Sequence, residues 1–546
     1  MWFILITSGL SILIATFIAY TVLKHRLLRN GAPLPCPPRS LILRNIPLMA
    51  DAMKKGMHID LLWKGISEQL GSKIFFVDVI FFKLVVILDV DMAKEVLVTK
   101  NYPKSFTYDS FYSLIGGKKS ILVSGGNLWH EQRMVFNPGF HYQYLKNLVP
   151  IFASNTERLV SILDKRCVTQ EVVSMHLLLT KLTMDIICEV VLGVTFNVLT
   201  KEEGRTSELY SSFKELMDNV LWFFKRQGIE WTRDYLPWNA LTMYRLETRY
   251  NNILIPIIKQ RMAELEAEPA LGSPAPSPKG SWVGGGLEED PMFRSLPSFG
   301  SDHLSLDGSL GTLAGNSDKD MCVLSVALRT AKEKGIKMEL DTVLAQVKTF
   351  FLAGHDTTAT TVSWAIYELA HNKEAEEKMV AEINQVCGGR IPTSDDLSQL
   401  TYTGCVVREA LRMWPPGGTT RIAPVGATLK GYGIGGHPLY IPHYCLHRDP
   451  QLWGEDADEF KPERWLDEDK LQKMNPFAYQ PFSKGKRNCI GQTFAVLEAR
   501  TLLAMLYSKF SFQYAGSEPE RQVHNVTSHP KDGVLMRVVS RAGMSQ

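Results

Sequence analysis

Ten residues near the carboxyl end, from Phe482 to Gly491, constrain this chain more tightly than any other stretch. They read FSKGKRNCIG, with one cysteine, Cys489, between two glycines. A cysteine at the opening of a helix lies beside backbone N–H groups and the positive end of the helix dipole, and both stabilise the thiolate that ligates iron. Gly485 permits a tight turn that directs the sulfur outward, and Gly491 lets a flat macrocycle lie against the helix without a Cβ in its way. We therefore predict that Cys489 is a metal ligand and not an ordinary buried cysteine.

The composition excludes several classes of protein. Of the 546 residues, 45% are hydrophobic and 21% are charged, which predicts a folded chain with a sizeable core. The net charge is only +3 and both signs are scattered along the chain, so nucleic acid is not expected as a partner. Eight cysteines without a CxxC pair are too sparse for a disulfide scaffold or a zinc ribbon, which indicates reduced thiols facing the cytosol.

The segment Trp2–Leu23 contains no charged residue. As a helix it would be about 33 Å long, enough to cross the hydrocarbon core of a bilayer. Lys24, His25 and Arg26 follow at once and form the basic flank that is expected on the cytosolic side. A cleavable signal peptide is the alternative, but it requires a charged n-region and a shorter apolar run. We predict an uncleaved, single-pass transmembrane anchor over residues 2–23, with the rest of the chain in the cytosol.

Two further segments differ from the rest of the chain. Residues 24–40 are first basic and then rich in proline, which predicts a stiff, extended spacer after the anchor. Of the 51 residues in 268–318, six are Pro, nine are Gly and nine are Ser, which predicts a disordered insertion. The motifs described below draw on both sides of this insertion, so residues 41–546 are predicted to form one domain that the insertion interrupts.

The remaining sequence predicts mainly helices. The β-branched and aromatic residues of 73–90 predict two adjacent strands, whereas apolar residues spaced by three and four predict helices through 91–261. Further helices are expected over 338–371, 393–413 and 490–508. The glycines of 431–436 match GxGxxG, but Pro438 and Pro442 forbid the helix that a dinucleotide site requires. We therefore predict a turn between short strands there.

The cysteine stretch fits the pattern FxxGxRxCxG at every fixed position, and in this the chain resembles the cytochrome P450 superfamily. The resemblance covers nearly the whole chain except 268–318. It implies a mainly α fold with small β-sheets, a single haem domain, and a haem b whose iron takes Cys489 as its axial ligand. It also implies that Phe482 covers the sulfur, that Arg487 pairs with a haem carboxylate and that Gly491 borders the haem.

A second motif lies in the middle of the predicted helix 338–371 and reads AGHDTT from Ala353 to Thr358. It resembles the stretch with which the family activates oxygen. Small residues there leave room for dioxygen, the Thr357 hydroxyl can donate a hydrogen bond to that dioxygen, and Asp356 can relay protons. The alternative interpretation is a helix with a polar stripe.

Glu409 and Arg412 lie three residues apart, so one helix face carries both as an ion pair. The family resemblance adds Arg464, from the sequence FKPERW, and implies a buried network of these three side chains. This network is structural, since it holds the cysteine loop under the haem and takes no part in the chemistry.

Trp129 and Arg133 lie four residues apart, which places them on one helix face. There each can donate a hydrogen bond to a haem propionate, although ordinary packing is the alternative for such a pair. Arg421 follows Arg412 by nine residues and fits a further propionate-binding arginine of the family. Together with Arg487, these residues are the predicted anchors of the two haem carboxylates.

The motifs together imply a haem-thiolate monooxygenase, an oxidoreductase that inserts one atom of O2 into an apolar small organic substrate. The sequence has no convincing flavin or iron–sulfur motif, so the resemblance implies electrons from NADPH through a separate diflavin reductase at the endoplasmic reticulum membrane. Lys484 and Lys486 could help to dock this reductase or could be plain solvated lysines.

Two other functions remain open at this point. A thiolate-haem isomerase or dehydratase would need no reductase, but such proteins usually lack the acid–alcohol pair that this chain keeps. A non-catalytic haem-binding protein is the other alternative. The stretch FNPGFHYQYLKNLVPIF at 136–152 resembles a fatty-acid-hydroxylase-like group that spans lipids, sterols, terpenoids and polyketides, so it does not identify the substrate.

Overall fold

The computed structural model describes residues 31–40, 44–78, 83–200, 207–227, 237–267, 322–524 and 527–541. The predicted anchor (2–23) and the predicted insertion (268–318) therefore lie outside the described residues. Among the residues that are described, no helix is both long enough and apolar enough to cross a membrane. The chain divides into two compact units: unit 1 comprises the residues up to Thr107 together with Thr419–Leu446, and unit 2 comprises Tyr108–Gly418 and His447–Gln546.

Unit 1 is built on a four-stranded sheet with the strand order β1-β2-β7-β4. Its strands and helices are α2 (Ile46–Lys54), α3 (Ile59–Leu70), β1 (Ile74–Asp78), β2 (Lys83–Ile87), α4 (Val90–Lys94), β4 (Thr419–Ile422), β5 (Thr428–Leu429), β6 (Tyr432–Gly433), β7 (Pro438–Ile441) and α18 (His443–Leu446). β1 pairs with β2 and β4 pairs with β7 in antiparallel fashion, whereas β2 and β7 are parallel. The unit has hydrophobic clusters of its own, around Val85 and around Trp63.

Two sequence predictions for unit 1 are confirmed. The stretch 73–90 forms the two adjacent strands β1 and β2. The glycines of 431–436 form a turn, because β6 pairs with β5 and no helix follows; Gly431 and Gly436 have φ of 84° and 72°, in the left-handed region that favours glycine.

The described part of the predicted spacer is extended but packs on unit 1. Ala32 N–H donates to Gly431 O at 2.8 Å, and Phe76 N–H donates to Pro35 O at 3.0 Å. The Asn45 side chain donates to Pro38 O at 3.0 Å. Its proline content keeps this segment out of a helix, and these hydrogen bonds attach it to unit 1.

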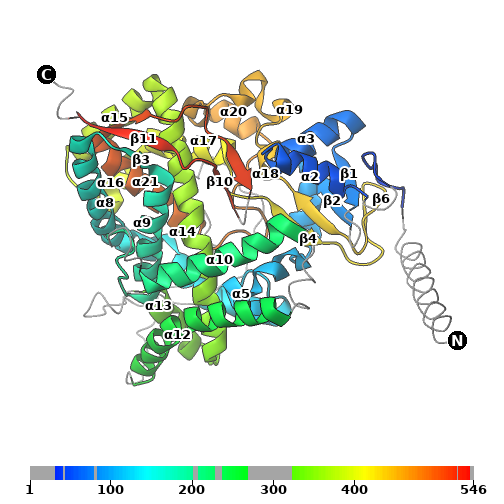
Figure 1. Ribbon diagram of the computed structural model, residues 1–546, viewed down its shortest axis with the longest axis horizontal. Helices are drawn as coiled ribbons and strands as arrows, with labels where there is room; N and C mark the ends of the chain where they lie inside the picture. The colour runs from blue at the N-terminus through cyan, green and yellow to red at the C-terminus, as the bar shows by residue number, and fades with distance from the viewer. Residues whose placement is uncertain are drawn as a thin grey trace. The chain divides into compact units, whose positions relative to one another are not determined.

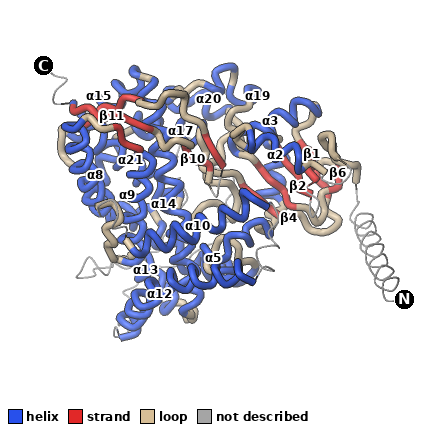
Figure 2. Tube along the Cα trace, viewed as in Figure 1, coloured by secondary structure: helices blue, strands red, loops and turns tan. Residues whose placement is uncertain are grey.

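Unit 2 is mainly helical, as Figure 2 shows. Its helices of five or more residues are α6 (Gly126–Phe136), α8 (Val149–Thr169), α9 (Met175–Leu192), α10 (Glu208–Gln227), α12 (Pro237–Ala267), α13 (Val323–Glu333), α14 (Leu340–His371), α15 (Lys373–Cys387), α16 (Ser394–Gln399), α17 (Thr401–Met413), α20 (Glu468–Lys473) and α21 (Gln492–Lys509). Short helical turns are α5 (Tyr112–Ile115), α7 (Tyr142–Leu145), α19 (Pro450–Trp453), η8 (Glu455–Asp458) and η9 (Pro462–Trp465).

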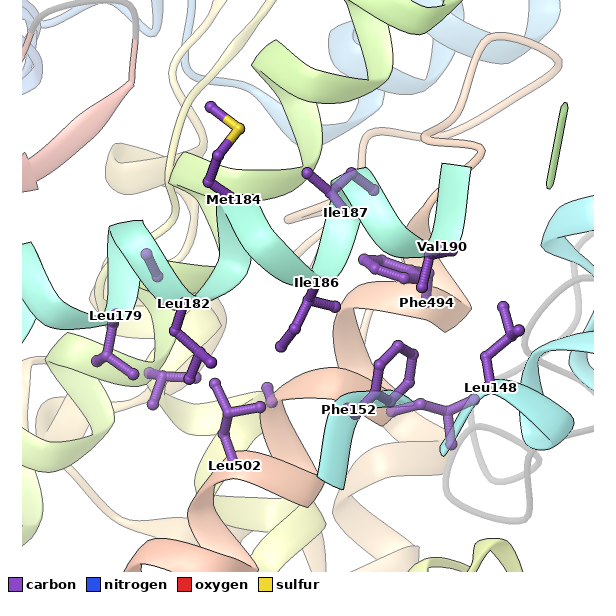
Figure 3. Packing of buried hydrophobic residues seen from close by; sticks show 14 of the residues in the cluster. Leu148, Phe152, Leu179, Leu182, Met184, Ile186, Ile187, Val190, Phe494 and Leu502 are labelled. Carbon is purple, nitrogen blue, oxygen red and sulfur yellow. The ribbon is translucent and has the colours of Figure 1, made fainter. Parts of the chain in front are cut away.

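The long helix α14 runs through unit 2 with α9 beside it (Figure 1). Buried residues lie on most of its circumference, which is the pattern of a helix enclosed by protein on all sides. Figure 3 shows side chains of α9 meeting those of α8 and α21 in the same core. Phe152 and Phe494 contact edge to face there, with ring centroids 5.3 Å apart. α14 is therefore enclosed by α9, α21 and other neighbouring elements.

The carboxyl end of the chain adds strands that the sequence did not predict. β3 (Val172–Ser174), β11 (Leu535–Ser540) and β8 (Phe510–Tyr514) form a three-stranded sheet. β9 (Gln522–His524) and β10 (Ser528–Pro530) form an antiparallel pair, and β10 packs against α14. The architecture is thus mainly α with small β-sheets, in agreement with the predicted fold class.

Candidate active site

The Cys489 loop is closed by its own backbone hydrogen bonds. Cys489 N–H donates to Phe482 O at 2.9 Å, and Asn488 N–H donates to Gly485 O at 3.0 Å. Gly485 has φ of 78°, so the glycine predicted for a tight turn is required by the backbone. Ser483 also lies in the left-handed region, with φ of 61°. Of the eight cysteines, all of them described, Cys489 alone is exposed, so this loop presents its sulfur outward.

The helix after the cysteine begins later than the sequence predicts. α21 starts at Gln492 with Gly491 as its N-cap, whereas the prediction placed the start at residue 490. Gly491 has φ of −87°, which any residue can adopt, so the backbone does not explain the glycine. A Cβ added there would stand 3.9 Å from Cys489 Sγ. The missing side chain therefore leaves space beside the sulfur.

Three of the predicted carboxylate anchors gather at this loop. Arg133, on α6, donates to Asn488 O at 3.3 Å and to Asn488 Oδ1 at 3.2 Å. The Arg487 guanidinium lies 4.0 Å from the centre of the Trp129 ring and donates to Ser124 O at 2.7 Å. The structure thus brings Trp129, Arg133 and Arg487 together with Cys489.

The Cys489 sulfur influences the pKa of Arg133. Burial lowers the pKa of Arg133, and negative charge on Cys489 opposes that effect by raising it. Nearby, burial lowers the pKa of Lys484 to about 8, whereas Lys486 is exposed. The remaining predicted anchor, Arg421, belongs to unit 1, where it is buried in β4 and donates to Thr420 O at 3.1 Å.

Glu409, on α17, is fully buried and is the centre of a polar network. Arg412 donates to its carboxylate from Nε at 2.9 Å and from Nη2 at 2.8 Å, and Arg464 donates from Nε at 2.9 Å. Trp465 Nε1 and the Lys461 backbone N–H complete the set, each at 2.9 Å. The structure thus brings the predicted trio of Glu409, Arg412 and Arg464 into contact.

His447 connects this network to the cysteine loop, and sequence reasoning missed it. Arg412 Nη1 donates to His447 O at 2.8 Å, and the Gln480 backbone N–H donates to His447 Nε2 at 3.0 Å. Gln480 O in turn accepts from Ser483 N–H at 2.9 Å, inside the loop. The imidazole is fully buried, and only the fold reveals its two partners. A histidine followed by Arg448 and Asp449 carries no such signal in the sequence alone.

On α14, the smallness of Gly354 serves helix packing. A Cβ at this position would lie 2.7 Å from Ile187 Cδ1 and 2.8 Å from Ile187 Cγ1, on α9. Gly354 therefore allows α14 to pack against α9, and the expectation that the small residues of this stretch leave room for dioxygen stays a prediction. Ala353 is exposed, and the Thr357 hydroxyl donates to its carbonyl at 2.7 Å. This hydrogen bond orients the Thr357 hydroxyl toward the carbonyl one turn earlier, and the helix continues without a break.

Asp356 points to a cluster of polar side chains. Its carboxylate accepts a hydrogen bond from the Thr527 hydroxyl, just before β10. Burial works to raise the pKa of Asp356, but the positive charge available on His355, His176 and His529 outweighs burial, so the pKa is lowered. The contact to Thr527 spans 171 residues of sequence, which no local pattern encodes.

A cavity of about 450 Å³ lies elsewhere, open to solvent between α10 and α12. Its lining includes the charged residues Glu208, Arg245 and Arg249, although most of the lining surface is apolar. None of the predicted site residues lines it, so it is separate from the cysteine loop.

The donors around Cys489 fit a haem. An exposed thiol beside a cationic guanidinium suits an iron ligand, and the space left by Gly491 borders the sulfur. Two arginines and an indole around the same loop suit the two carboxylates that a haem carries. No group of three or more metal-ligating residues occurs among the described residues.

The chain matches the family model for Cytochrome P450 over residues 35–537. This range covers nearly the whole chain, so the protein belongs to the cytochrome P450 family. It is therefore a haem-thiolate monooxygenase, an oxidoreductase whose haem iron has a cysteine thiolate ligand and whose electrons come from a redox partner.

Curated relatives agree with the family assignment. Cytochrome P450 4V2 of Mus musculus is 30% identical over 463 residues, which cover 82% of this chain and 78% of the relative. Cytokinin hydroxylase of Arabidopsis thaliana is 30% identical over 457 residues, which cover 82% of this chain and 77% of the relative. Protein LUTEIN DEFICIENT 5, chloroplastic, of Arabidopsis thaliana is 28% identical over 465 residues, which cover 84% of this chain and 70% of the relative.

Proposed function

We propose that Cys489 is the axial haem ligand of a membrane-anchored monooxygenase that hydroxylates an apolar small organic molecule. The observation that carries this proposal is the closed loop around Cys489, whose outward thiol lies beside Arg133. A bound haem supplies the redox chemistry that activates O2 and transfers one of its oxygen atoms to the substrate. The protein supplies ligation, orientation and protons.

Each predicted site residue has one proposed task. Trp129, Arg133 and Arg487 bind the haem carboxylates, since they already surround the cysteine loop. Arg421 is proposed as a further carboxylate ligand, on the strength of the family motif alone. Phe482 forms part of the loop wall, because its carbonyl accepts the Cys489 N–H.

The acid–alcohol pair on α14 handles protons. Asp356 carries a carboxyl group that can accept a proton and pass it on, and it is held by the Thr527 hydroxyl. The Thr357 hydroxyl donates to Ala353 O, and rotation about χ1 would redirect it to a ligand on the exposed side of Ala353. We propose a structural role for the network of Glu409, Arg412 and Arg464, because Arg412 and Arg464 both donate to the buried Glu409 carboxylate.

The proposed electron donor is a membrane-bound, NADPH-dependent diflavin reductase. Lys486 is exposed within the cysteine loop and offers a positive charge for docking an acidic partner. Lys484 is half-buried and, with a pKa near 8, is mostly protonated at pH 7.

The proposed substrate class is apolar and includes lipids, sterols, terpenoids and polyketides. One relative is named a hydroxylase, which supports an oxygen-inserting reaction.

The proposed location is the endoplasmic reticulum membrane, with residues 2–23 as the anchor and the body in the cytosol. Deleting residues 2–23 should release a haem-binding body from membranes, at least in part. A body that stays fully membrane-bound after this deletion would contradict the anchor.

In the decisive experiment, the purified protein is mixed with a purified diflavin reductase, NADPH and an extract of cells that lack the gene. A monooxygenase consumes NADPH and O2 and adds one oxygen atom to a compound in the extract. An isomerase or dehydratase would transform a compound without NADPH, and a haem carrier would transform none. Either result would contradict the proposed function.

A further inference from the structure

The carboxyl end of α17 is capped by two neighbouring side chains from a later part of the chain. Arg412 and Met413 are the last two residues of this helix, so their carbonyls have no partner within it. The Met413 carbonyl accepts from Arg448 Nε at 3.0 Å. The Arg412 carbonyl lies 3.2 Å from Nδ1 of His447. His447 and Arg448 thus complete the end of the helix that carries Glu409.

The partners of His447 determine which nitrogen of its ring carries the proton. The Arg412 carbonyl can only accept a hydrogen bond, so Nδ1 must donate to it. The Gln480 backbone N–H can only donate, and it lies 3.0 Å from Nε2, so Nε2 must accept from it. These two contacts assign the neutral Nδ1–H tautomer to His447. The fully buried ring therefore joins α17 to the segment that leads into the cysteine loop.

Gln480 continues this connection into the loop around Cys489. The Gln480 carbonyl accepts from Ser483 N–H at 2.9 Å, and the Phe482 carbonyl accepts from Cys489 N–H at 2.9 Å. Ser483 has φ of 61°, a left-handed conformation that a residue with a Cβ adopts only at a cost in free energy. Such a conformation persists where the surrounding structure determines it. The turn before Cys489 therefore depends on contacts that hold Gln480 in place.

His447 is the contact that holds the backbone of Gln480. Gln480 is only 1% exposed, so solvent cannot replace the imidazole as acceptor for its N–H. A buried donor that loses its acceptor destabilises the structure by more than an average hydrogen bond contributes. The preceding residue, Tyr479, is attached to α17 through its hydroxyl, which donates to Arg408 O at 3.2 Å. That contact fixes a side chain, whereas the contact from His447 fixes the chain that enters the loop.

We propose that His447 is a positioning residue for the haem ligand Cys489, and that it acts through the hydrogen bond from the Gln480 N–H to its Nε2 atom. This bond holds the turn from which the sulfur projects, so that the thiolate stays in place to bind iron. The inference rests on the proposed function, in which Cys489 is the axial ligand, and it adds a residue outside the loop that the ligation requires.

Two amide variants separate the two hydrogen bonds of the ring. In His447→Gln the side-chain oxygen can occupy the place of Nε2 and still accept from Gln480, whereas the shorter amide of His447→Asn reaches only the place of Nδ1. His447→Phe keeps a ring against Tyr479, whose centroid lies 5.5 Å from that of the imidazole, but has neither nitrogen. His371→Asn is the control, because His371 is exposed and its Nδ1 contacts Tyr367 O within α14.

The first measurement is the carbon-monoxide spectrum of each reduced, haem-loaded variant. We expect His447→Gln and His371→Asn to keep the thiolate-type spectrum. In His447→Asn and His447→Phe the ratio of thiolate-type to other haem should fall at least about fivefold, which is the lower bound for an unsatisfied buried donor. Loss of haem from these two variants, with His447→Gln intact, is the same result in a stronger form. A Phe variant closer to the wild type than the Gln variant would show that the ring serves packing and would overturn the proposal.

The second measurement is backbone hydrogen exchange over residues 480–488 of the ferric haem protein, followed by mass spectrometry. Exchange there should be at least about fivefold faster in His447→Asn, or in His447→Phe where haem is retained, and unchanged in His447→Gln. Equal exchange in all variants would contradict the attachment of the loop through His447. A His447→Gln protein that loses haem would contradict it as well, since this variant keeps the acceptor.

The third measurement is 15N NMR of histidine-labelled protein in its diamagnetic ferrous carbon-monoxide form. The signal that disappears in His447→Gln should show the Nδ1–H tautomer, and an Nε2–H tautomer would overturn the proposal. If the wild type lacks a thiolate-type spectrum, the proposed function itself fails. If the wild type has this spectrum and every His447 variant keeps it, only the role of His447 fails.

Discussion

Replacing Glu409 by alanine should prevent haem incorporation by destabilising the fold, and not merely slow the reaction. The carboxylate is fully buried and accepts five hydrogen bonds, from Arg412 Nε and Nη2, Arg464 Nε, Trp465 Nε1 and the Lys461 backbone N–H. Truncation removes the acceptor for all five donors. Arg412, also fully buried, would keep the carbonyls of His447, Ala457 and Glu459 as hydrogen-bond acceptors but would have no carboxylate beside it.

The size of the expected loss in stability follows from the positive charge of Arg412, which would be left without its carboxylate partner. Removing one member of a buried ion pair costs about 3–5 kcal/mol. A typical domain has a free energy of unfolding of about 5–15 kcal/mol, so the loss is a large part of the total. Because Arg412 is linked through His447 to Gln480, the cysteine loop should lose its order with the network.

The assay combines haem content after purification with denaturant unfolding followed by circular dichroism. Glu374→Ala is the control, because Glu374 is 79% exposed in its ion pair with Lys378 and should leave both measurements at the wild-type level. A Glu409→Ala protein that keeps full haem and an unchanged unfolding midpoint, but reacts slowly, would refute the structural role of the network.

Three further predictions concern single side chains. Thr357→Ala should keep much of the NADPH consumption while product falls and hydrogen peroxide rises, because proton delivery loses its hydroxyl; equal product and peroxide in variant and wild type would contradict this. Burial raises the pKa of Asp60 to about 7, against a hydrogen bond from Tyr440, so between about pH 4 and pH 7 the native state binds more protons than the unfolded state. Stability should therefore fall by up to about 4 kcal/mol as pH rises through this window, and Asp60→Asn should flatten that slope in unfolding experiments. Gly354→Ala should destabilise the protein, because its Cβ would lie 2.7 Å from Ile187 Cδ1, and adding Ile187→Ala should recover part of the loss; a stable single variant would contradict the packing.

The sequence predicts an element correctly where the residues that determine its structure lie close together in the chain. The turn at Gly485 needs a left-handed φ, and the paired strands of 73–90 carry the β-branched residues that such strands favour. The long helix α14 was expected over 338–371 and spans Leu340–His371. In each case the residues that determine the structure lie within the element itself.

The rest depends on contacts between distant parts of the chain. The pairing of His176 with His529 and the contact of Asp356 with Thr527 arise only when α9, α14 and β10 pack together. The role of Gly354 is set by Ile187, a side chain on another helix. The strands β8 to β11 were not predicted, because each is short and is stabilised by cross-strand pairing.

The most direct test of the central claim is the carbon-monoxide difference spectrum of the reduced protein, compared between wild type and Cys489→Ala. Ligation by Cys489 predicts a thiolate-type spectrum in the wild type and its complete loss in the variant, while Cys405→Ala, at a buried cysteine outside the loop, should retain the thiolate-type position. A Cys489→Ala protein that keeps the thiolate-type spectrum would contradict the assignment of the haem ligand and the site built around it.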